Sequence, residues 1–330
     1  MQEQDWRPTA TPAALRRRAA LLAGVRRYFA AQGVLEVETP LLSTASIPDP
    51  HIPSFVVAEA AGSAMGEQPT RYLNTSPEFA MKRLLAAGMG PIYQVCKAFR
   101  RGEQGSHHNP EFTLLEWYRP GFDHQRLMED VEALVRSLDT GDTPLGPAER
   151  LSYQACFQRY LDIDPHRASV AALKSCAQQQ GLGKVSGLSD ADRDGWLDLL
   201  MSHCIQPQLG RDGPTFIFDY PANQAALARI RPGEPPVAER FELFIEGIEL
   251  ANGFHELQDA QEQRARFEAD LIRRQQAGLE RVDIDERLLN ALESGLPACA
   301  GVALGLDRLQ LVLSGLPQLS DVLAFPYDRS

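Results

Sequence analysis

The sequence has no long hydrophobic run. No stretch approaches the roughly 18 consecutive apolar residues of a membrane-spanning helix. The first residues, MQEQDWRPTATPAALRRR, also lack the apolar centre of a signal peptide. We therefore expect a soluble, cytoplasmic protein that has no membrane partner.

The sequence also lacks the cysteine patterns of secreted domains and zinc sites. Its five cysteines are odd in number, widely scattered and without any CxxC pair. This pattern excludes a disulfide framework or a structural zinc site and is typical of a reducing cytosol. Cys299 lies near a segment with catalytic features, but we interpret it as a small buried hydrophobe rather than a nucleophile.

An excess of positive charge is absent as well. The 330 residues include 33 Lys and Arg against 44 Asp and Glu, a net charge of −11. Because non-specific nucleic-acid binding depends on basic residues that neutralise phosphates, this balance argues against it as the main function. A nucleotide can still bind locally, and a basic macromolecular partner fits the charge better than an acidic one.

What remains is an ordinary globular composition, 44% hydrophobic and 23% charged, without repeats or low-complexity tracts. Periodicity and turn residues predict alternating helices and strands. The predicted helices span about Thr11–Ala31, 124–137, 169–180 and 256–278. The predicted strands span Val34–Val37, Phe55–Ala58, Tyr93–Arg100, Thr215–Asp219 and 240–252. We interpret residues 122–213 as a helical insertion in a single domain that spans residues 1–330.

The segment Arg100–Tyr118, RRGEQGSHHNPEFTLLEWY, is the most informative part of the chain. A loop rich in hydrogen-bonding groups precedes a strand in which every second side chain shares a face. Phe112, Leu114, Glu116 and Tyr118 then point one way, which suits a ring stacked on Phe112 and an ammonium group held by Glu116. An ordinary amphipathic edge strand is the alternative interpretation.

Residues 241–252, FELFIEGIELAN, predict a hairpin with a two-residue turn at Glu246-Gly247. In that register Ile245 pairs with Ile248, Phe244 with Glu249, and Glu242 with Ala251. Glu242 and Glu249 then share a face as diagonal neighbours, roughly 7–8 Å apart at the backbone. Such a pair needs a cation between its carboxylates, and Mg²⁺ bound to phosphates is the natural candidate. A solvent-facing pair of glutamates is the alternative.

Two glycine-containing segments follow. In NGFHEL, Asn252–Leu257, Gly253 is expected to let the chain bend close to a ligand, and His255 is given no chemical role. In PACAGVALGLDRLQLVL, residues 297–313, a glycine-rich strand leads into an apolar helix. Arg308 lies at that junction, where an arginine suits phosphate binding or stacking on a base.

Taken together, these segments resemble the catalytic core of class II aminoacyl-tRNA synthetases, and specifically the lysyl branch. Motif 1 is visible in Gly33–Leu42, motif 2 in Phe99–Glu116 and motif 3 in Gly301–Leu309, and FELFIEGIELANGFHEL resembles the lysyl-specific stretch. The resemblance implies an α+β fold, an antiparallel sheet flanked by helices, and a homodimer formed partly through motif 1.

The resemblance also implies roles for individual residues. Arg100 and Arg308 are the expected catalytic residues, with adenine between Phe112 and Arg308. The expected ATP-binding residues are Arg100, Arg101, Gly102, Glu103, His108, Asn109, Phe112, Glu249, Leu250, Gly305 and Arg308. The expected substrate-binding residues are Ser76, Pro77, Glu78, Glu116, Tyr118, Asn252, Glu256 and Ala303. Glu242 and Glu249 are the expected Mg²⁺ ligands.

Three departures from lysyl-tRNA synthetases point to a related family. Only about fourteen residues precede the motif 1 helix, too few for an anticodon-binding OB barrel. Gly102 stands where a glutamate is usual, with Glu103 one position late, and Ala303 replaces a glycine beside the expected substrate. With these departures, the sequence resembles the elongation factor P–(R)-β-lysine ligases, which lack an anticodon domain.

That resemblance implies the use of ATP and Mg²⁺ to activate (R)-β-lysine as an adenylate, and its transfer to a lysine of elongation factor P, without anticodon reading. Two alternatives stay open at this point. One is a free-standing enzyme, or a lysyl-tRNA synthetase fragment, that activates α-lysine. The other is a non-catalytic regulatory paralogue of the synthetases.

Overall fold

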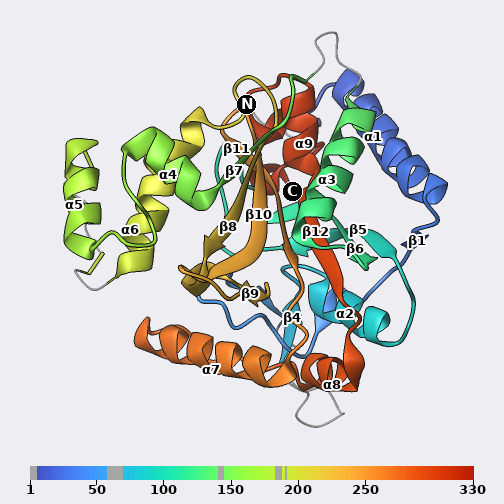
Figure 1. Ribbon diagram of the computed structural model, residues 1–330. Coiled ribbons are helices and arrows are strands. Elements are labelled where there is room, and N and C mark those ends of the chain that lie inside the picture. Colours follow the sequence, from blue (N-terminus) through green and yellow to red (C-terminus); the bar gives the residue numbers. More distant parts are fainter. Residues whose placement is uncertain (1–5, 58–69, 140–144, 183–187, 190–191) are drawn as a thin grey trace. The chain divides into compact units, whose positions relative to one another are not determined.

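The computed structural model describes residues 6–57, 70–139, 145–182, 188–189 and 192–330. The chain divides into two compact units, whose elements are labelled in Figure 1. Unit 1 comprises Met1–Gly121, Gln258–Cys299 and Ala303–Ser330, and unit 2 comprises Phe122–Leu257 and Ala300–Val302. Strand β12, Cys299–Gly305, therefore contributes residues to both units.

Unit 1 contains the elements that carry motifs 1, 2 and 3. Its helices are α1 Pro12–Ala31, α2 Glu78–Ala86, α7 Ala260–Gln276, α8 Glu286–Gly295 and α9 Leu306–Leu313. Its strands, besides its part of β12, are β1 Leu35–Glu36, β2 Leu42–Ser43, β3 Val56–Val57, β4 Arg71–Leu73, β5 Ile92–Phe99 and β6 Glu111–Pro120.

Helix α1 forms where the sequence predicts a helix. The Thr11 hydroxyl caps the helix by accepting a hydrogen bond from the backbone N–H of Ala14, and Pro12 occupies its first turn. Its buried residues are Ala14, Leu21, Val25 and Phe29, and the Phe29 ring stacks on Tyr93 at 4.4 Å and meets Trp117 at 5.4 Å. The helix thus packs against β5 and β6.

Strands β5 and β6 form a long antiparallel pair, in which Gln94 lies opposite Glu116. β6 is buried from Thr113 to Arg119, on both of its faces, which rules out the exposed amphipathic edge strand as an interpretation. The expected strand Val34–Val37 forms as β1, which runs parallel to β5. The strand expected at Phe55–Ala58 forms as β3, and Ala58 lies outside the described residues.

Unit 2 contains the carboxylate hairpin and the predicted insertion. Its helices are α3 His124–Leu138, α4 Tyr153–Leu161, α5 Val170–Gln179 and α6 Arg193–Leu200. Its strands, besides its part of β12, are β7 Glu149–Ser152, β8 Thr215–Pro221, β9 Ile230–Arg231, β10 Val237–Ile245 and β11 Ile248–His255. They pair in the order β11-β10-β8-β7, with β9 beside β10.

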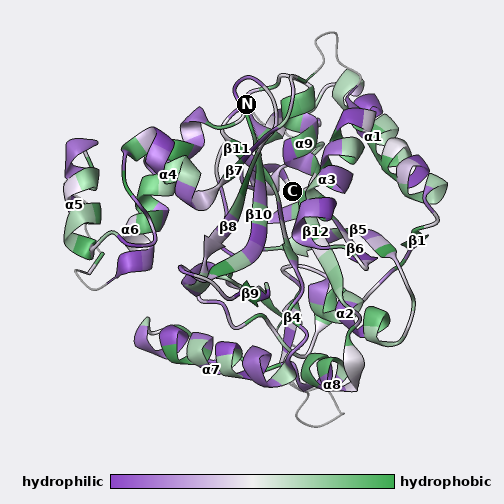
Figure 2. Cartoon of the chain, in the orientation of Figure 1, coloured by the Kyte–Doolittle hydropathy of each residue, from purple (hydrophilic) through white to green (hydrophobic). Residues whose placement is uncertain are grey.

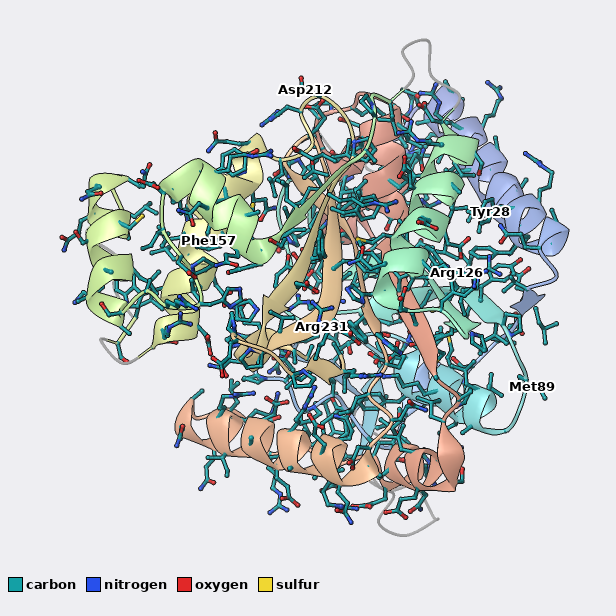
Figure 3. The ribbon with its side chains drawn as sticks, viewed as in Figure 1. Tyr28, Met89, Arg126, Phe157, Asp212 and Arg231 are labelled. Atoms are coloured by element: carbon teal, nitrogen blue, oxygen red, sulfur yellow. The ribbon has the colours of Figure 1, made fainter. Side chains whose placement is uncertain are left out.

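The predicted helical insertion packs on this sheet. Phe157 on α4, labelled in Figure 3, is fully buried with Trp196 and Leu197 of α6 and with Ile217 of β8. Because these side chains form one apolar cluster, α4–α6 are an integral part of unit 2. The pairs β7–β8 and β1–β5 are parallel, whereas β5–β6, β8–β10 and β10–β11 are antiparallel.

The expected α+β class and the helix-flanked sheet are therefore confirmed, with parallel pairing at β1 and β7. Helix α7 begins at Ala260, four residues later than expected, because β11 continues to His255 and Asp259 caps the helix. Figure 2 shows hydrophilic and hydrophobic residues interleaved along α7. Among the described helices, none is long and apolar enough to span a membrane.

Candidate active site

The motif 2 loop of unit 1 turns sharply at Gly102. Its φ of +87° lies in the left-handed region, which glycine adopts at little cost and a glutamate does not. This turn presents Glu103 to Arg100, whose guanidinium lies 3.5 Å from the Glu103 carboxylate. Glu103 thus contacts Arg100 although it lies one position later than the usual glutamate. The left-handed backbone at position 102 explains why a glycine stands there.

Arg100 has unused hydrogen-bonding capacity. Its guanidinium lies over the ring of Phe112, with 5.1 Å between the central carbon and the ring centroid. Its Nε is buried and has no hydrogen-bond partner among the described residues. Since a buried donor without a partner costs roughly 1–3 kcal/mol, this nitrogen is suited to an acceptor oxygen that a ligand would bring.

Arg308 lies beside the same loop. Its Nε donates to the carbonyl of His107 at 3.0 Å, and an Nη lies 2.7 Å from Nε2 of His108. The preceding residue, Asp307, is buried, accepts from the backbone N–H of Thr113 at 2.8 Å, and pairs with Arg18 at 2.6 Å. Helix α9 is thereby fixed to β6 and α1, which places Arg308 at the motif 2 loop.

The Asn109 side chain makes two hydrogen bonds within the protein. Its Nδ2 donates to the carbonyl of Glu111 at 2.6 Å, and its Oδ1 accepts from the backbone N–H of Tyr327 at 2.9 Å. These two bonds hold the loop in front of β6 against the C-terminal segment. The predicted contact between Asn109 and ATP stays a prediction.

Glu116 is the central buried carboxylate of unit 1. It is 2% exposed, and each of its oxygens accepts a hydroxyl hydrogen bond, from Tyr118 at 2.6 Å and from Ser76 at 2.7 Å. Glu116 and Tyr118 therefore share a face, as the alternation predicts. Burial, followed by the nearby charge of Glu78, raises the pKa of Glu116 to about 7.

Next to Glu116, the start of helix α2 supplies a second carboxylate. Glu78 lies in the first turn, and its backbone N–H donates to the Ser76 hydroxyl at 3.0 Å. Its side chain accepts from Nζ of Lys82, one helical turn later, at 2.7 Å. Two carboxylates, two hydroxyls and one ammonium are thus clustered, an arrangement that can bind a further cationic group.

A cavity of about 260 Å³ lies beside this cluster, and Ser76, Pro77 and Glu78 form part of its wall. Asn74 also lines it, and both polar atoms of that amide are buried without a hydrogen-bond partner in the described part of the chain. Unpartnered amide atoms at a cavity wall are suited to a polar ligand or water.

In unit 2 the hairpin forms with the predicted turn, but its register departs from the prediction. Ile245 pairs with Ile248 and Phe244 with Glu249, as expected. A bulge at Leu250 then shifts the register, so Glu242 pairs with Asn252 and the predicted pairing with Ala251 is wrong. The reason is that both Leu250 and Ala251 are buried, which strict alternation does not allow.

The bulge changes which side chains share a face. Opposite residues in an antiparallel pair point the same way, so Asn252 joins Glu242 and Glu249 on one face. Arg240, also on that face, donates to Oδ1 of Asn252 at 3.1 Å and to the Glu242 carboxylate. Sequence reasoning missed Arg240, although its spacing of two residues from Glu242 in a strand is a usable signal.

Glu242 is not a solvent-facing residue. Its side chain is 12% exposed, and the Tyr220 hydroxyl donates to Oε2 at 2.6 Å. Burial raises the pKa of Glu242 to about 7; Arg240 opposes this rise, while Glu249 and Asp198 add to it. Tyr220 and Asp198, which lies on α6 of the insertion, are further residues that the sequence patterns did not reveal.

The donor chemistry of this face fits Mg²⁺ only together with other ligands. When all four groups are ionised, the net charge is two negative, because one cation, Arg240, faces three carboxylates, Glu242, Glu249 and Asp198. Within the described ranges, however, no group of three or more His, Cys, Asp or Glu side chains is arranged to hold a metal. A hard cation there would need further oxygens, such as those of phosphates and water.

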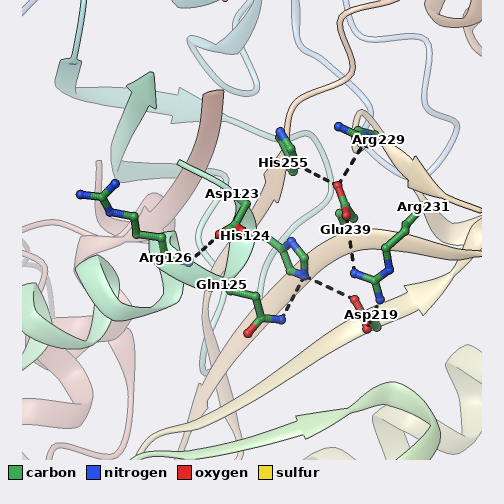
Figure 4. Close-up of polar contacts among 9 residues, drawn as sticks. All are labelled: Asp123, His124, Gln125, Arg126, Asp219, Arg229, Arg231, Glu239 and His255. Atoms are coloured by element: carbon green, nitrogen blue, oxygen red, sulfur yellow. Dashed lines mark hydrogen bonds and ion pairs between the residues drawn. The ribbon is translucent and has the colours of Figure 1, made fainter. Parts of the chain in front are cut away.

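His255 belongs to a structural ion network, shown in Figure 4. Its Nδ1 lies 2.8 Å from Glu239, which also faces Arg231 at 3.5 Å. Arg231 in turn pairs with Asp219 at 2.5 Å, and Asp219 lies 3.3 Å from Nε2 of His124. The network links α3 with β8, β9, β10 and β11, which supports the interpretation that His255 has no chemical role.

Gly253 has no room for a side chain, and its expected closeness to a ligand stays a prediction. A Cβ on this residue would lie 2.7 Å from both the Phe241 ring and the Val302 Cβ, so side-chain packing within unit 2 fills this space. Glu256, three residues later, has a fully buried carboxylate.

Each unit thus gathers part of the predicted set. In unit 1 the structure clusters Ser76, Glu78, Glu116 and Tyr118, and separately Arg100, Glu103, His108, Phe112 and Arg308. In unit 2 it places Glu242, Glu249 and Asn252 on one face.

All five cysteines are free thiols, and Cys299 is completely buried, as predicted. Burial raises the pKa of Cys96 and of Cys156 to about 12. Neither thiol is therefore activated as a nucleophile.

Residues 4–329 match the family described as tRNA synthetases class II (D, K and N). The chain is 49% identical over 325 residues to an elongation factor P–(R)-β-lysine ligase of Vibrio vulnificus, which covers 98% of this chain and 99% of the relative. It is 50% identical over 326 residues to the protein of that name from Erwinia tasmaniensis, covering 98% of each. A relative of the same name from Salmonella paratyphi B is 49% identical over 325 residues, 98% of each chain. With its synthetase motifs in place, the chain belongs to the class II tRNA synthetase family and, within it, to the elongation factor P–(R)-β-lysine ligases.

Proposed function

We propose that the protein is an ATP-dependent ligase that activates (R)-β-lysine as an aminoacyl-adenylate and transfers it to a lysine side chain of elongation factor P. The family membership supports this activity. The observation that carries the adenylate chemistry is Arg100, whose buried Nε lacks a partner while its guanidinium lies over Phe112.

The first step forms the adenylate. The carboxylate of the amino acid attacks the α-phosphorus of ATP, an O–P bond forms, and the bond to pyrophosphate breaks. Negative charge grows on the α-phosphate oxygens, and Arg100 is positioned to stabilise it as a hydrogen-bond donor. Phe112 offers a face for adenine and Arg308 a cation for its other side or for phosphate. Arg101, Gly102, Glu103, His108, Asn109, Leu250 and Gly305 complete the proposed nucleotide contacts.

The second step forms the isopeptide bond. The neutral ε-amine of the acceptor lysine attacks the activated carbonyl and a C–N bond forms. AMP leaves with the electron pair of the C–O bond, and the amine nitrogen releases one proton to solvent. The ammonium groups of the substrate need anionic partners, and Glu78 and Glu116 are the proposed ones in unit 1. Ser76, Pro77 and Tyr118 would line the same pocket, and Asn252 and Glu256 are proposed as further substrate contacts.

Mg²⁺ is proposed at Glu242 and Glu249. When bound with ATP it would neutralise phosphate charge and favour the departure of pyrophosphate. The excess of carboxylates over Arg240 on this face supports the assignment.

We also propose a homodimer formed partly through motif 1. Leu35 and Leu42 of this segment are 51% and 45% exposed, and a second copy would cover them. A cytoplasmic location is part of the same proposal, because free thiols persist in a reducing compartment.

The test is the intact mass of elongation factor P after incubation with the enzyme, ATP and one lysine isomer at a time. We expect the mass of a single added lysyl residue with (R)-β-lysine, little addition with α-lysine, and none without ATP. Preferential addition from α-lysine would contradict the substrate assignment. Absence of both addition and ATP–pyrophosphate exchange with every isomer would favour a non-catalytic paralogue.

A further inference from the structure

Lys82 is a buried lysine with no role in the proposed chemistry so far. It lies on the inner face of α2 with Met81 and Leu85, and is 1% exposed. Its Nζ donates to Oε1 of Glu78 at 2.7 Å. Lysine is rarely buried to this extent unless it is paired, so its position requires a physical reason.

The reason lies in the charge of the substrate cluster. The charge of Glu78 disfavours ionisation of the buried Glu116 carboxyl group. A buried carboxyl group beside a second carboxylate normally retains its proton. With Lys82 protonated, the cluster contains two negative charges and one positive charge, which leaves one net negative charge for an ammonium group.

We propose that Lys82 is a positioning residue that increases the ionised fraction of Glu116, so that this carboxylate can accept hydrogen bonds from an ammonium group of the amino acid. This inference rests on the proposed function, because it assigns the charge of the same substrate pocket. Lys82 itself touches Glu78 rather than the reacting atoms.

The groups around Glu116 act in opposite directions. Burial and Glu78 favour its neutral form, whereas the hydroxyls of Tyr118 and Ser76 and the charge of Lys82 favour its ionised form. The Cys96 thiol on β5 also faces it, but burial raises the pKa of Cys96 to about 12 and keeps it neutral. Lys82 is thus the cation among these neighbours, and its charge adds to the two hydroxyl hydrogen bonds that favour the ionised form of Glu116.

The test is the pH dependence of kcat/KM for (R)-β-lysine in ATP–pyrophosphate exchange by the full-length Lys82→Gln variant. Removing the cation is expected to raise the pKa of Glu116 by about one unit. At pH 7 its ionised fraction then falls from about one half to about one tenth, so kcat/KM falls about fivefold relative to the unmodified enzyme. By about pH 9 the two enzymes should converge, and the KM for ATP should stay unchanged.

Matched variants separate charge from packing. Lys97→Gln removes a lysine that is paired with Glu111 on the exposed side of β5, and it should leave the profile unchanged. Lys82→Arg keeps the charge and should return the midpoint toward that of the unmodified enzyme. A defect in Lys82→Gln that is equal at every pH would refute the proposal and indicate a structural role alone.

A second measurement does not depend on turnover or on the identity of the substrate. The carboxyl ¹³C signal of Glu116, assigned with Glu116→Gln, can be titrated in the ligand-free protein. Its midpoint should rise in Lys82→Gln. It should be lower in Glu78→Gln/Lys82→Gln than in Lys82→Gln, because the opposing charge of Glu78 is removed as well, and this double variant serves if the single variant fails to fold. An unchanged midpoint would overturn the inference even if the ligase activity is confirmed, whereas a raised midpoint without ligase activity would refute only the proposed function.

Discussion

At the scale of single residues, a buried carboxylate such as Glu116 lowers the stability of the folded protein and provides a binding group for an ammonium ion. Glu116 has a pKa near 7 in the folded protein against an ordinary 4.5. Below pH 4.5 it is protonated in both the folded and unfolded states. As the pH rises above 4.5 and through 7, the carboxyl group ionises more readily in the unfolded chain than in the folded protein. The free energy of unfolding therefore falls.

Glu116→Gln should therefore stabilise the protein at pH 8. The raised pKa corresponds to about 3 kcal/mol, and the amide loses about 1 kcal/mol with one hydroxyl partner, so a net gain of about 2 kcal/mol is expected. Urea unfolding at pH 8 and pH 4 measures it, and the gain should vanish at the lower pH. Glu111→Gln, an exposed change at the start of the same strand, is the control. An equal gain at both pH values would contradict the ionisation account.

A second residue-scale prediction concerns Ala303, which replaces the glycine of lysyl-tRNA synthetases. Ala303→Gly removes one methyl from the proposed substrate pocket and should increase use of α-lysine relative to β-lysine by about tenfold. The ratio of kcat/KM values in ATP–pyrophosphate exchange measures this. Ala300→Gly makes the same chemical change on β12 and should leave the ratio unaltered; unchanged selectivity in Ala303→Gly would refute the steric explanation.

At the scale of elements, the β10–β11 hairpin shows how packing overrides alternation. The turn at Glu246-Gly247 is predictable because glycine tolerates its φ of +73°. The bulge at Leu250 is not, because two adjacent residues become buried and only the surrounding sheet decides which one leaves the ladder.

The same hairpin yields a stability prediction. Gly253→Ala would place a Cβ 2.7 Å from both Phe241 and Val302, so one of them must shift. We expect a destabilisation of about 1–3 kcal/mol in urea unfolding. Gly105→Ala meets nothing within 4 Å and is the control, expected to be nearly neutral. A neutral Gly253→Ala would mean that the space is not filled as described.

At the scale of the whole molecule, the exposed apolar residues of motif 1 predict self-association. Sedimentation should give about twice the 36.5 kDa of one chain. Leu42→Asp should shift the protein toward monomers, because a charge would be buried in the interface. Ile272→Asp changes a similarly exposed residue on α7 and should leave the mass unaltered. A monomeric unmodified protein would contradict the proposed dimer.

The sequence by itself determined the hairpin turn and the shared face of Glu116 and Tyr118, because these depend on local alternation and turn chemistry. Its resemblance to class II synthetases located the motifs and implied the α+β class. Only the tertiary structure decided that Lys82 pairs with Glu78, that Arg240 bridges Glu242 and Asn252, and that Gly102 turns Glu103 toward Arg100. Buried ion pairs and bulges depend on what surrounds a residue in three dimensions, and spacing along the chain carries little of that information.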